Sequence, residues 1–142
     1  MPNYLVQIGQ TALKSFIFLF NFNLTLATIL DFANVDCALI TETWFTTRHL
    51  SQYVAIDGYD VFRRDRPKRD GGRVCIYVRN NIDASVVTFT DSPTRFEKIW
   101  ITFSNGKHEY YAACCYHPPA PRYCSEDLIA EIIDDIDHYV AQ

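Results

Sequence analysis

The stretch "EKIWITFSNGKHEYYAACCY", residues 97–116, decides the fold, because it reads as two β-strands joined by a turn. Its halves, "KIWITF" and "YYAACCY", are apolar runs of strand length that are rich in aromatic or β-branched residues. Between them stands Asn105-Gly106, the dipeptide that most strongly marks a β-hairpin. The stretch therefore predicts two antiparallel neighbours in one sheet.

Further strands are predicted on the N-terminal side of this hairpin. Asp57-Gly58 and Asn80-Asn81 are turn signals that bound two of them. The runs are "CALIT" (37–41), "YDVF" (59–62), "VCIYV" (74–78) and "ASVVTFT" (84–90). One helix is predicted to end within "TLATILDFANVD" (25–36). Another is predicted to be capped by Ser125, with acids in its first turn and apolar residues at helical spacing from Leu128 onward. About six strands and two helices predict an α/β layered domain.

Composition points to a globular domain, or part of one, with a charged loop. The chain has 142 residues, of which 49% are hydrophobic and 15% aromatic, enough to build a core. The net charge is only -4, but basic residues crowd the segment from Arg63 to Arg79. A locally basic loop in an acidic chain predicts an anionic partner at one place.

The cysteines and the N-terminal run bear on the cellular compartment. The five cysteines are odd in number and form no CxxC zinc pattern, which indicates a reduced, intracellular chain. The run from Phe16 to Leu30 leaves a signal-peptide core as the alternative. Asn21 and Asn23 interrupt that run, and it is shorter than the roughly 20 residues of a membrane span. We therefore expect no membrane partner.

Five motifs occur along the chain in the order "ITETW", "GYDVFRRDRPKRDGGRVCIYVRNNI", "EKIWITF", "YYAACCYHPPAP" and "DLIAEIIDDID". In this order they resemble the endonuclease domain of non-LTR retrotransposons. That domain belongs to the endonuclease/exonuclease/phosphatase superfamily, with the apurinic/apyrimidinic endonucleases. The resemblance implies part of a four-layer α/β sandwich of two mixed β-sheets flanked by helices, truncated after the first half. It makes residues 24–142 the partial domain and residues 1–23 a divergent N-terminal segment.

The resemblance also implies site residues. Glu42 matches a glutamate that holds a divalent ion, usually Mg²⁺, at the end of a core strand. Tyr116 matches a tyrosine whose hydroxyl contacts the scissile phosphate, whereas His117 is not the catalytic histidine. A solvated strand end and a core aromatic are the alternatives for Glu42 and Tyr116. The basic loop fits contact with the DNA backbone, or is only a solvated turn. Its candidate DNA-binding residues are Arg63, Arg64, Arg66, Lys68 and Arg69.

Departures from the family leave enzymatic activity open. Family members carry a metal-binding asparagine roughly thirty residues before the glutamate, but no Asn occurs between Asn3 and Asn21. The Asp and Asn that orient water and phosphate, and the late Asp and His, have no counterpart. Three functions remain: a fragment of a metal-dependent DNA endonuclease, an inactive remnant with weak DNA binding, or another phosphodiesterase of the superfamily. An active form would work in the nucleus beside a reverse transcriptase. Exposed strand edges predict self-association.

Overall fold

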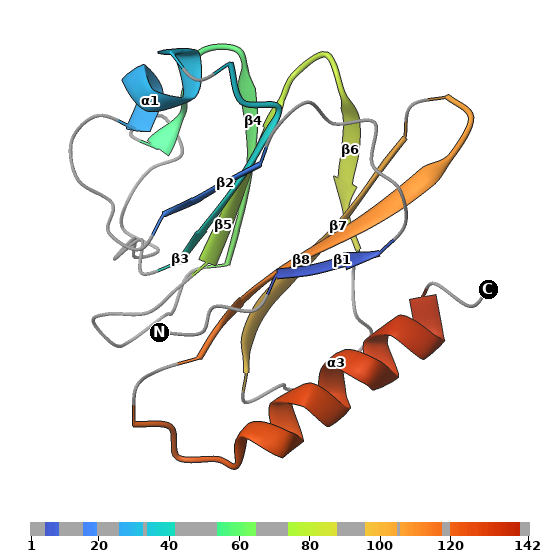
Figure 1. The fold of residues 1–142 in the computed structure, drawn as a ribbon. Helices are drawn as coiled ribbons and strands as arrows, with labels where there is room; N and C mark the ends of the chain where they lie inside the picture. Colours follow the sequence, from blue (N-terminus) through green and yellow to red (C-terminus); the bar gives the residue numbers. More distant parts are fainter. Residues whose placement is uncertain are drawn as a thin grey trace.

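The computed structural model describes residues 5–8, 16–19, 26–32, 34–41, 54–64, 74–87, 96–104, 106–117 and 120–139. In this part of the chain two strands precede the first helix, six strands follow it, and a longer helix comes last (Figure 1). They are β1 (Leu5–Ile8), β2 (Phe16–Leu19), α1 (Leu26–Phe32), β3 (Cys37–Thr41), β4 (Tyr59–Arg64), β5 (Val74–Arg79), β6 (Asp83–Val86), β7 (Glu97–Ser104), β8 (Glu109–Tyr116) and α3 (Ser125–Tyr139). The expected α/β class is confirmed.

The strands form two sheets. The first sheet has the order β1-β8-β7-β6, and all of its described pairs are antiparallel. The second sheet has the order β2-β3-β5-β4 and is mixed, because β2 runs parallel to β3 while the other pairs are antiparallel. The predicted hairpin is β7 and β8, which pair from Ser104 and Glu109 onward. Gly106 has a φ of 85°, a left-handed conformation that glycine adopts without a steric penalty.

Both faces of the central strands are buried. Strand alternation sends Val74, Ile76 and Val78 of β5 toward the first sheet, and Cys75 and Tyr77 toward α1. This double burial explains why "CALIT" and "VCIYV" are continuous apolar runs instead of alternating ones. The inter-sheet core contains Cys37, Leu39, Val74, Ile76, Val78, Ile99, Ile101, Phe103, Tyr110, Ala112, Cys114 and Tyr116.

The two helices cover the outer faces. Leu26 and Leu30 of α1 pack on the second sheet, on the side away from the inter-sheet core. Leu128 and Ile132 of α3 pack on the first sheet against Trp100 and other outward-facing residues. Figure 1 shows α1 and α3 at opposite sides of the pair of sheets. No helix of the described residues is long and apolar enough to cross a membrane.

A buried ionic cluster attaches α3 to β7. Lys98 Nζ lies 2.5 Å from Asp135 Oδ2 and also contacts Glu131, while its side chain is only 4% exposed. The indole nitrogen of Trp100 donates to the same Asp135 oxygen at 2.9 Å. The cluster fixes the position of the helix, because buried charges must be paired and hydrogen-bonded.

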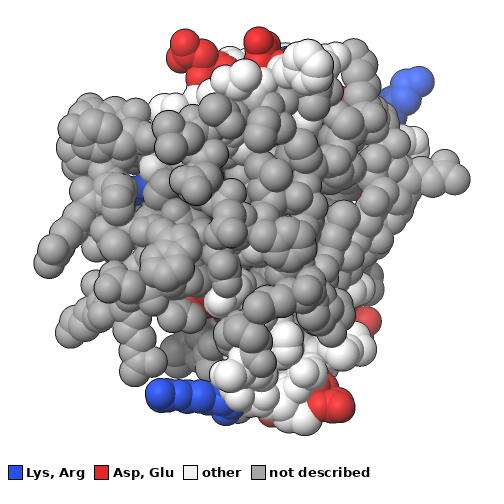
Figure 2. All heavy atoms as spheres, turned by 60° about the vertical axis from the view of Figure 1, so that its left-hand side comes forward, with Lys and Arg blue, Asp and Glu red and all other residues white. Residues whose placement is uncertain are grey.

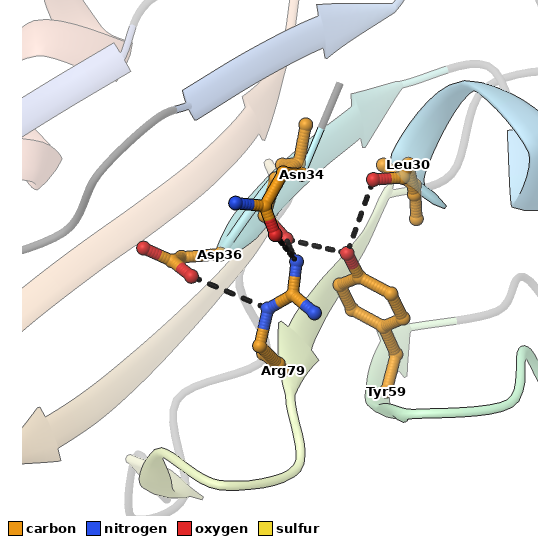
Figure 3. Close-up of polar contacts among 6 residues, drawn as sticks. Leu30, Asn34, Asp36, Tyr59 and Arg79 are labelled. Atoms are coloured by element: carbon orange, nitrogen blue, oxygen red, sulfur yellow. Dashed lines mark hydrogen bonds and ion pairs between the residues drawn. The ribbon is translucent and has the colours of Figure 1, made fainter. Parts of the chain in front are cut away.

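The segment between α1 and β3 is held by Tyr59. Asn34 has a φ of 50°, and Val35 N donates to Leu30 O at 3.1 Å, so the helix ends here in a left-handed turn. The Tyr59 hydroxyl donates to the carbonyl oxygens of Leu30 and Val35 (Figure 3).

Arg79, the last residue of β5, makes further contacts with the segment between α1 and β3. Its guanidinium donates to Asn34 Oδ1 at 2.9 Å, to Val35 O at 3.0 Å and to Asp36 Oδ1 at 3.3 Å. It also lies 5.3 Å from the centre of the Tyr59 ring. These contacts fix the position at which β3 begins. They therefore also help to position the residues at its end.

Candidate functional site

Strands β3 and β8 cross in contact near their carboxyl ends. The thiol of Cys114 donates to Ile40 O across the inter-sheet core, at 3.6 Å. Both strands run toward the lower left in Figure 1. Tyr116, two residues beyond Cys114, is the last residue of β8, and Thr41 is the last of β3. Glu42 follows Thr41 directly and lies outside the described residues.

Strand β2 ends at the same end of the pair of sheets as β3 and β8. β2 and β3 are parallel, with Leu19 opposite Ile40. The chain therefore leaves both strands at the same end of the second sheet. The residues that follow β2 include Asn21 and Asn23, which also lie outside the described residues. These two asparagines stand about twenty residues before Glu42, closer than the roughly thirty residues that the resemblance implies for a metal-binding asparagine.

Tyr116 lies on the inter-sheet face and is 8% exposed. Its partner across the hairpin is Glu97, the first residue of β7. Directly paired residues of an antiparallel sheet share a face, so this carboxylate lies beside the tyrosine. Sequence reasoning missed Glu97, although the hairpin register places it opposite the end of β8.

Thr41 adds a buried hydroxyl at this end of the sandwich. Thr41 is 1% exposed, and among the described residues its Oγ1 has no hydrogen-bond partner. A buried hydroxyl left without a partner costs about 1–3 kcal/mol, so such groups call for explanation. The carboxylate of Glu97 is a hard oxygen ligand of the type that Mg²⁺ takes, whereas the hydroxyls of Thr41 and Tyr116 are suited to donate a hydrogen bond. Within the described ranges, no group of three or more His, Cys, Asp or Glu side chains could hold a metal ion.

Only two of the predicted DNA-binding residues are described. Arg63 and Arg64 end β4 and point to opposite faces by alternation. Arg64 donates to Lys98 O at 3.2 Å, which holds it against the first sheet. The other three, Arg66, Lys68 and Arg69, lie outside the described residues. In Figure 2 the described basic side chains of this face lie apart from one another.

A second polar cluster connects the end of β8 to α3. His117 Nδ1 lies 3.1 Å from the Tyr123 hydroxyl, and its Nε2 lies 3.3 Å from Ser125 Oγ. Sequence reasoning expected Ser125 to cap α3. The helix instead begins with Ser125, and the carbonyl of Cys124 accepts a bond from Asp127 N at 3.1 Å. His117 thus faces away from Tyr116, as alternation predicts.

The cysteines do not form a site among the described residues. Cys37, Cys75, Cys114 and Cys115 are buried and Cys124 is exposed, all as free thiols. Burial raises the pKa of Cys37 and of Cys115 to about 12, so these thiols stay protonated at neutral pH. Cys114 and Cys115 face different cores and therefore pack separately.

No protein-family model matches this chain, and no curated protein matches its sequence.

Proposed function

We propose that this chain is the first part of a retrotransposon-type DNA endonuclease domain of the endonuclease/exonuclease/phosphatase superfamily. One observation carries the proposal: the carboxyl ends of β2, β3 and β8 lie at the same end of the pair of sheets. The residues that the family resemblance singles out, or would require, follow or end these strands. They are Asn21 or Asn23 after β2, Glu42 after β3, and Tyr116 at the end of β8.

The proposed roles follow from side-chain chemistry. Glu42 and one of the two asparagines would hold Mg²⁺ through oxygen atoms. The ion would neutralise charge on the phosphate and lower the pKa of a bound water. Tyr116 would donate its hydroxyl to a phosphate oxygen, and the basic loop would contact neighbouring phosphates without reading sequence. The described layers, a helix, two sheets and a second helix, agree in order with the implied four-layer sandwich, of which this chain would supply the first part.

A second candidate, an inactive remnant that binds DNA weakly, shares this site. It is favoured because no residue of the chain matches the groups that orient the attacking water or protonate the leaving oxygen. Losing one such group costs several kcal/mol in a transition state, on the order of 10²–10³ in rate. We therefore expect the 142-residue chain alone not to nick supercoiled plasmid at a useful rate in millimolar Mg²⁺.

Two experiments test the proposal. Plasmid relaxation is measured with the purified chain, using Glu42→Gln to exclude a contaminating nuclease. Nicking that disappears in this variant would show that residues of the chain have replaced the missing groups. The coding sequence after Gln142 is then read. An in-frame continuation with the missing Asp, Asn and His supports the endonuclease, and a decayed frame supports the remnant.

A metal-binding measurement tests the site itself. Mn²⁺ serves as a paramagnetic substitute for Mg²⁺ in ¹H–¹⁵N spectra of the chain. We expect line broadening at Thr41 and Tyr116 that Glu42→Gln abolishes and that either Asn21→Ala or Asn23→Ala reduces. Broadening confined to α3, where acidic residues are abundant, would show that the metal ion does not bind at this end of the sheets.

A further inference from the structure

Strand β4 forms one edge of the second sheet. It pairs with β5 on one side, and no other strand of the described residues pairs with its far side. With six residues it is the longest of the edge strands, because β1, β2 and β6 have four each. Asp60 and Arg64 of β4 are exposed. An edge strand of this length is a surface onto which another strand can pair.

The backbone of β4 has one row of polar groups that points away from β5. Asn80 N donates to Gly58 O at 2.9 Å, one step before the β4–β5 ladder begins. Hydrogen-bonded and non-hydrogen-bonded pairs alternate along an antiparallel ladder, so Asp60 also bonds to β5. The N–H and C=O of Val61 therefore point to the far side of the strand.

The order of side chains along β4 selects one way to pair it with a second copy of itself. Side chains alternate between faces, so an antiparallel pair with twofold symmetry is centred on one residue, which meets its own copy. Centring on Phe62 places Asp60 opposite Arg64 of the second copy, twice, and pairs Val61 with Arg63. Centring on Asp60 or on Arg63 places like charges opposite each other, which is destabilising. Centring on Val61 leaves Asp60 opposite Phe62, without an opposite charge.

The pairing centred on Phe62 also groups compatible side chains on one face. Phe62 is partly buried against the inter-sheet core, and Asp60 and Arg64, two residues to either side, share its face. Within the described part of the chain Asp60 has no ion pair. Arg64 can keep its bond to Lys98 O, because a guanidinium has five N–H donors. An aromatic pair flanked by two opposite-charge pairs is a stabilising arrangement in antiparallel sheets.

We propose that β4 is a docking edge for a second copy of this chain, and that two β4 strands pair antiparallel about Phe62, with two Asp60–Arg64 ion pairs. The second copy fits because β4 carries both charges in an order that is complementary to itself when the strand is reversed. The two second sheets then form one continuous sheet. The shared contact is a single short strand, so the dimer is weak and depends on concentration. The inference goes beyond the proposed function and does not rest on it.

Charge reversal tests the pairing. Sedimentation equilibrium of the whole chain at pH 7.5 measures the dimer dissociation constant, with a reducing agent present because Cys124 is exposed. Asp60→Arg alone and Arg64→Asp alone each replace two ion pairs with two like-charge pairs. We expect each to weaken dimerisation by about tenfold. The double variant exchanges the two charges and should restore dimerisation to within about threefold of the natural chain.

A mixture of the two single variants gives a second measurement. Each variant repels its own copy, but their charges are complementary, so an equimolar mixture should form a heterodimer. Asp83→Arg, on the exposed edge strand β6 of the first sheet, is the matched control and should leave dimerisation unchanged. A ¹H–¹⁵N spectrum of each variant checks that it is folded.

Three results would overturn the inference. The first is a natural chain that stays monomeric up to millimolar concentration. The second is a dimer that Asp60→Arg leaves intact or that Asp83→Arg disrupts, since either places the contact elsewhere. The third is a folded double variant that does not recover dimerisation, because the pairing about Phe62 requires that recovery.

Discussion

Lys98 Nζ lies 2.5 Å from Asp135 Oδ2, inside the contact between β7 and α3. The same amine contacts Glu131, and Trp100 donates to the same Asp135 oxygen. Two carboxylates thus share one buried ammonium. The helix is held by a charge cluster as well as by its apolar face, which makes its attachment sensitive to the loss of a single charge.

Replacing Lys98 with Met should therefore destabilise the chain strongly. The substitution leaves Asp135 buried without its ammonium partner, and such a loss costs about 3–5 kcal/mol. The free energy of unfolding is measured by urea denaturation. Lys107→Met, on the exposed β7–β8 loop, is the control and should change stability by less than about 0.5 kcal/mol. Equal effects of the two substitutions would show that the cluster does not hold α3.

Thiol chemistry should distinguish Cys124 from the other cysteines. Cys124 is exposed and the remaining four are buried, so an aromatic disulfide reagent should modify one thiol in the folded chain at pH 8. Urea should expose all five. Cys124→Ser is the control and should abolish the reaction of the folded chain. Rapid reaction of several thiols without urea would contradict the buried positions.

Stability should fall at alkaline pH. The folded pKa of Cys37 and of Cys115 is about 12, above the ordinary value of 9.0, because burial disfavours the thiolate. Between these values the unfolded chain releases protons that the folded chain retains. The stabilisation is therefore fully present below pH 9 and is lost as pH rises toward 12. Urea midpoints measured from pH 8 to 10.5 should decline, and Cys115→Ala should make the decline shallower.

Asn34 allows a direct measurement of backbone strain. Its φ of 50° costs roughly 1–2 kcal/mol for a residue with an ordinary side chain and little for glycine. Asn34→Ala and Asn34→Gly both remove the bond from Arg79, so their difference isolates the backbone. We expect the glycine variant to be the more stable, by about 1 kcal/mol in urea denaturation. An alanine variant as stable as the glycine variant would exclude the left-handed turn.

DNA binding should depend on salt through the basic loop. Each lost phosphate contact reduces the slope of log K against log salt by about 0.9. Converting Arg63, Arg64, Arg66 and Arg69 to Ala should lower both the affinity and this slope, measured by fluorescence anisotropy with a labelled duplex. Arg122→Ala is the control for a general change in charge. Unchanged binding would mean that the loop is only a solvated turn.

Much of the fold could be predicted from short-range patterns. The continuous runs around Leu39 and Ile76 gave buried strands, Asn105-Gly106 gave the hairpin, and the spacing from Leu128 onward gave α3. The start of α3 was assigned to capping by Ser125, but its hydroxyl is bonded to His117. That partner is set by tertiary packing, which local preferences do not encode.

The candidate site was less accessible to sequence reasoning. Glu97 gains meaning only through its register opposite Tyr116, and Thr41 only through its burial. Neither property is visible in residue type. The pairing of β1 with β8 was also missed, because partners so far apart in the chain leave no local signal.

That last pairing has a kinetic consequence. β1 joins the first sheet by placing Leu5 opposite Cys114, so almost the whole chain must be synthesised before this strand finds its neighbour. The β7–β8 hairpin can close early, because its partners are adjacent in sequence. Closing the long loop costs entropy before any contact compensates for it, and folds with such distant contacts form slowly. During translation, the N-terminal strand should wait with its backbone unpaired, a state in which chaperone capture or pairing with another nascent chain competes with folding.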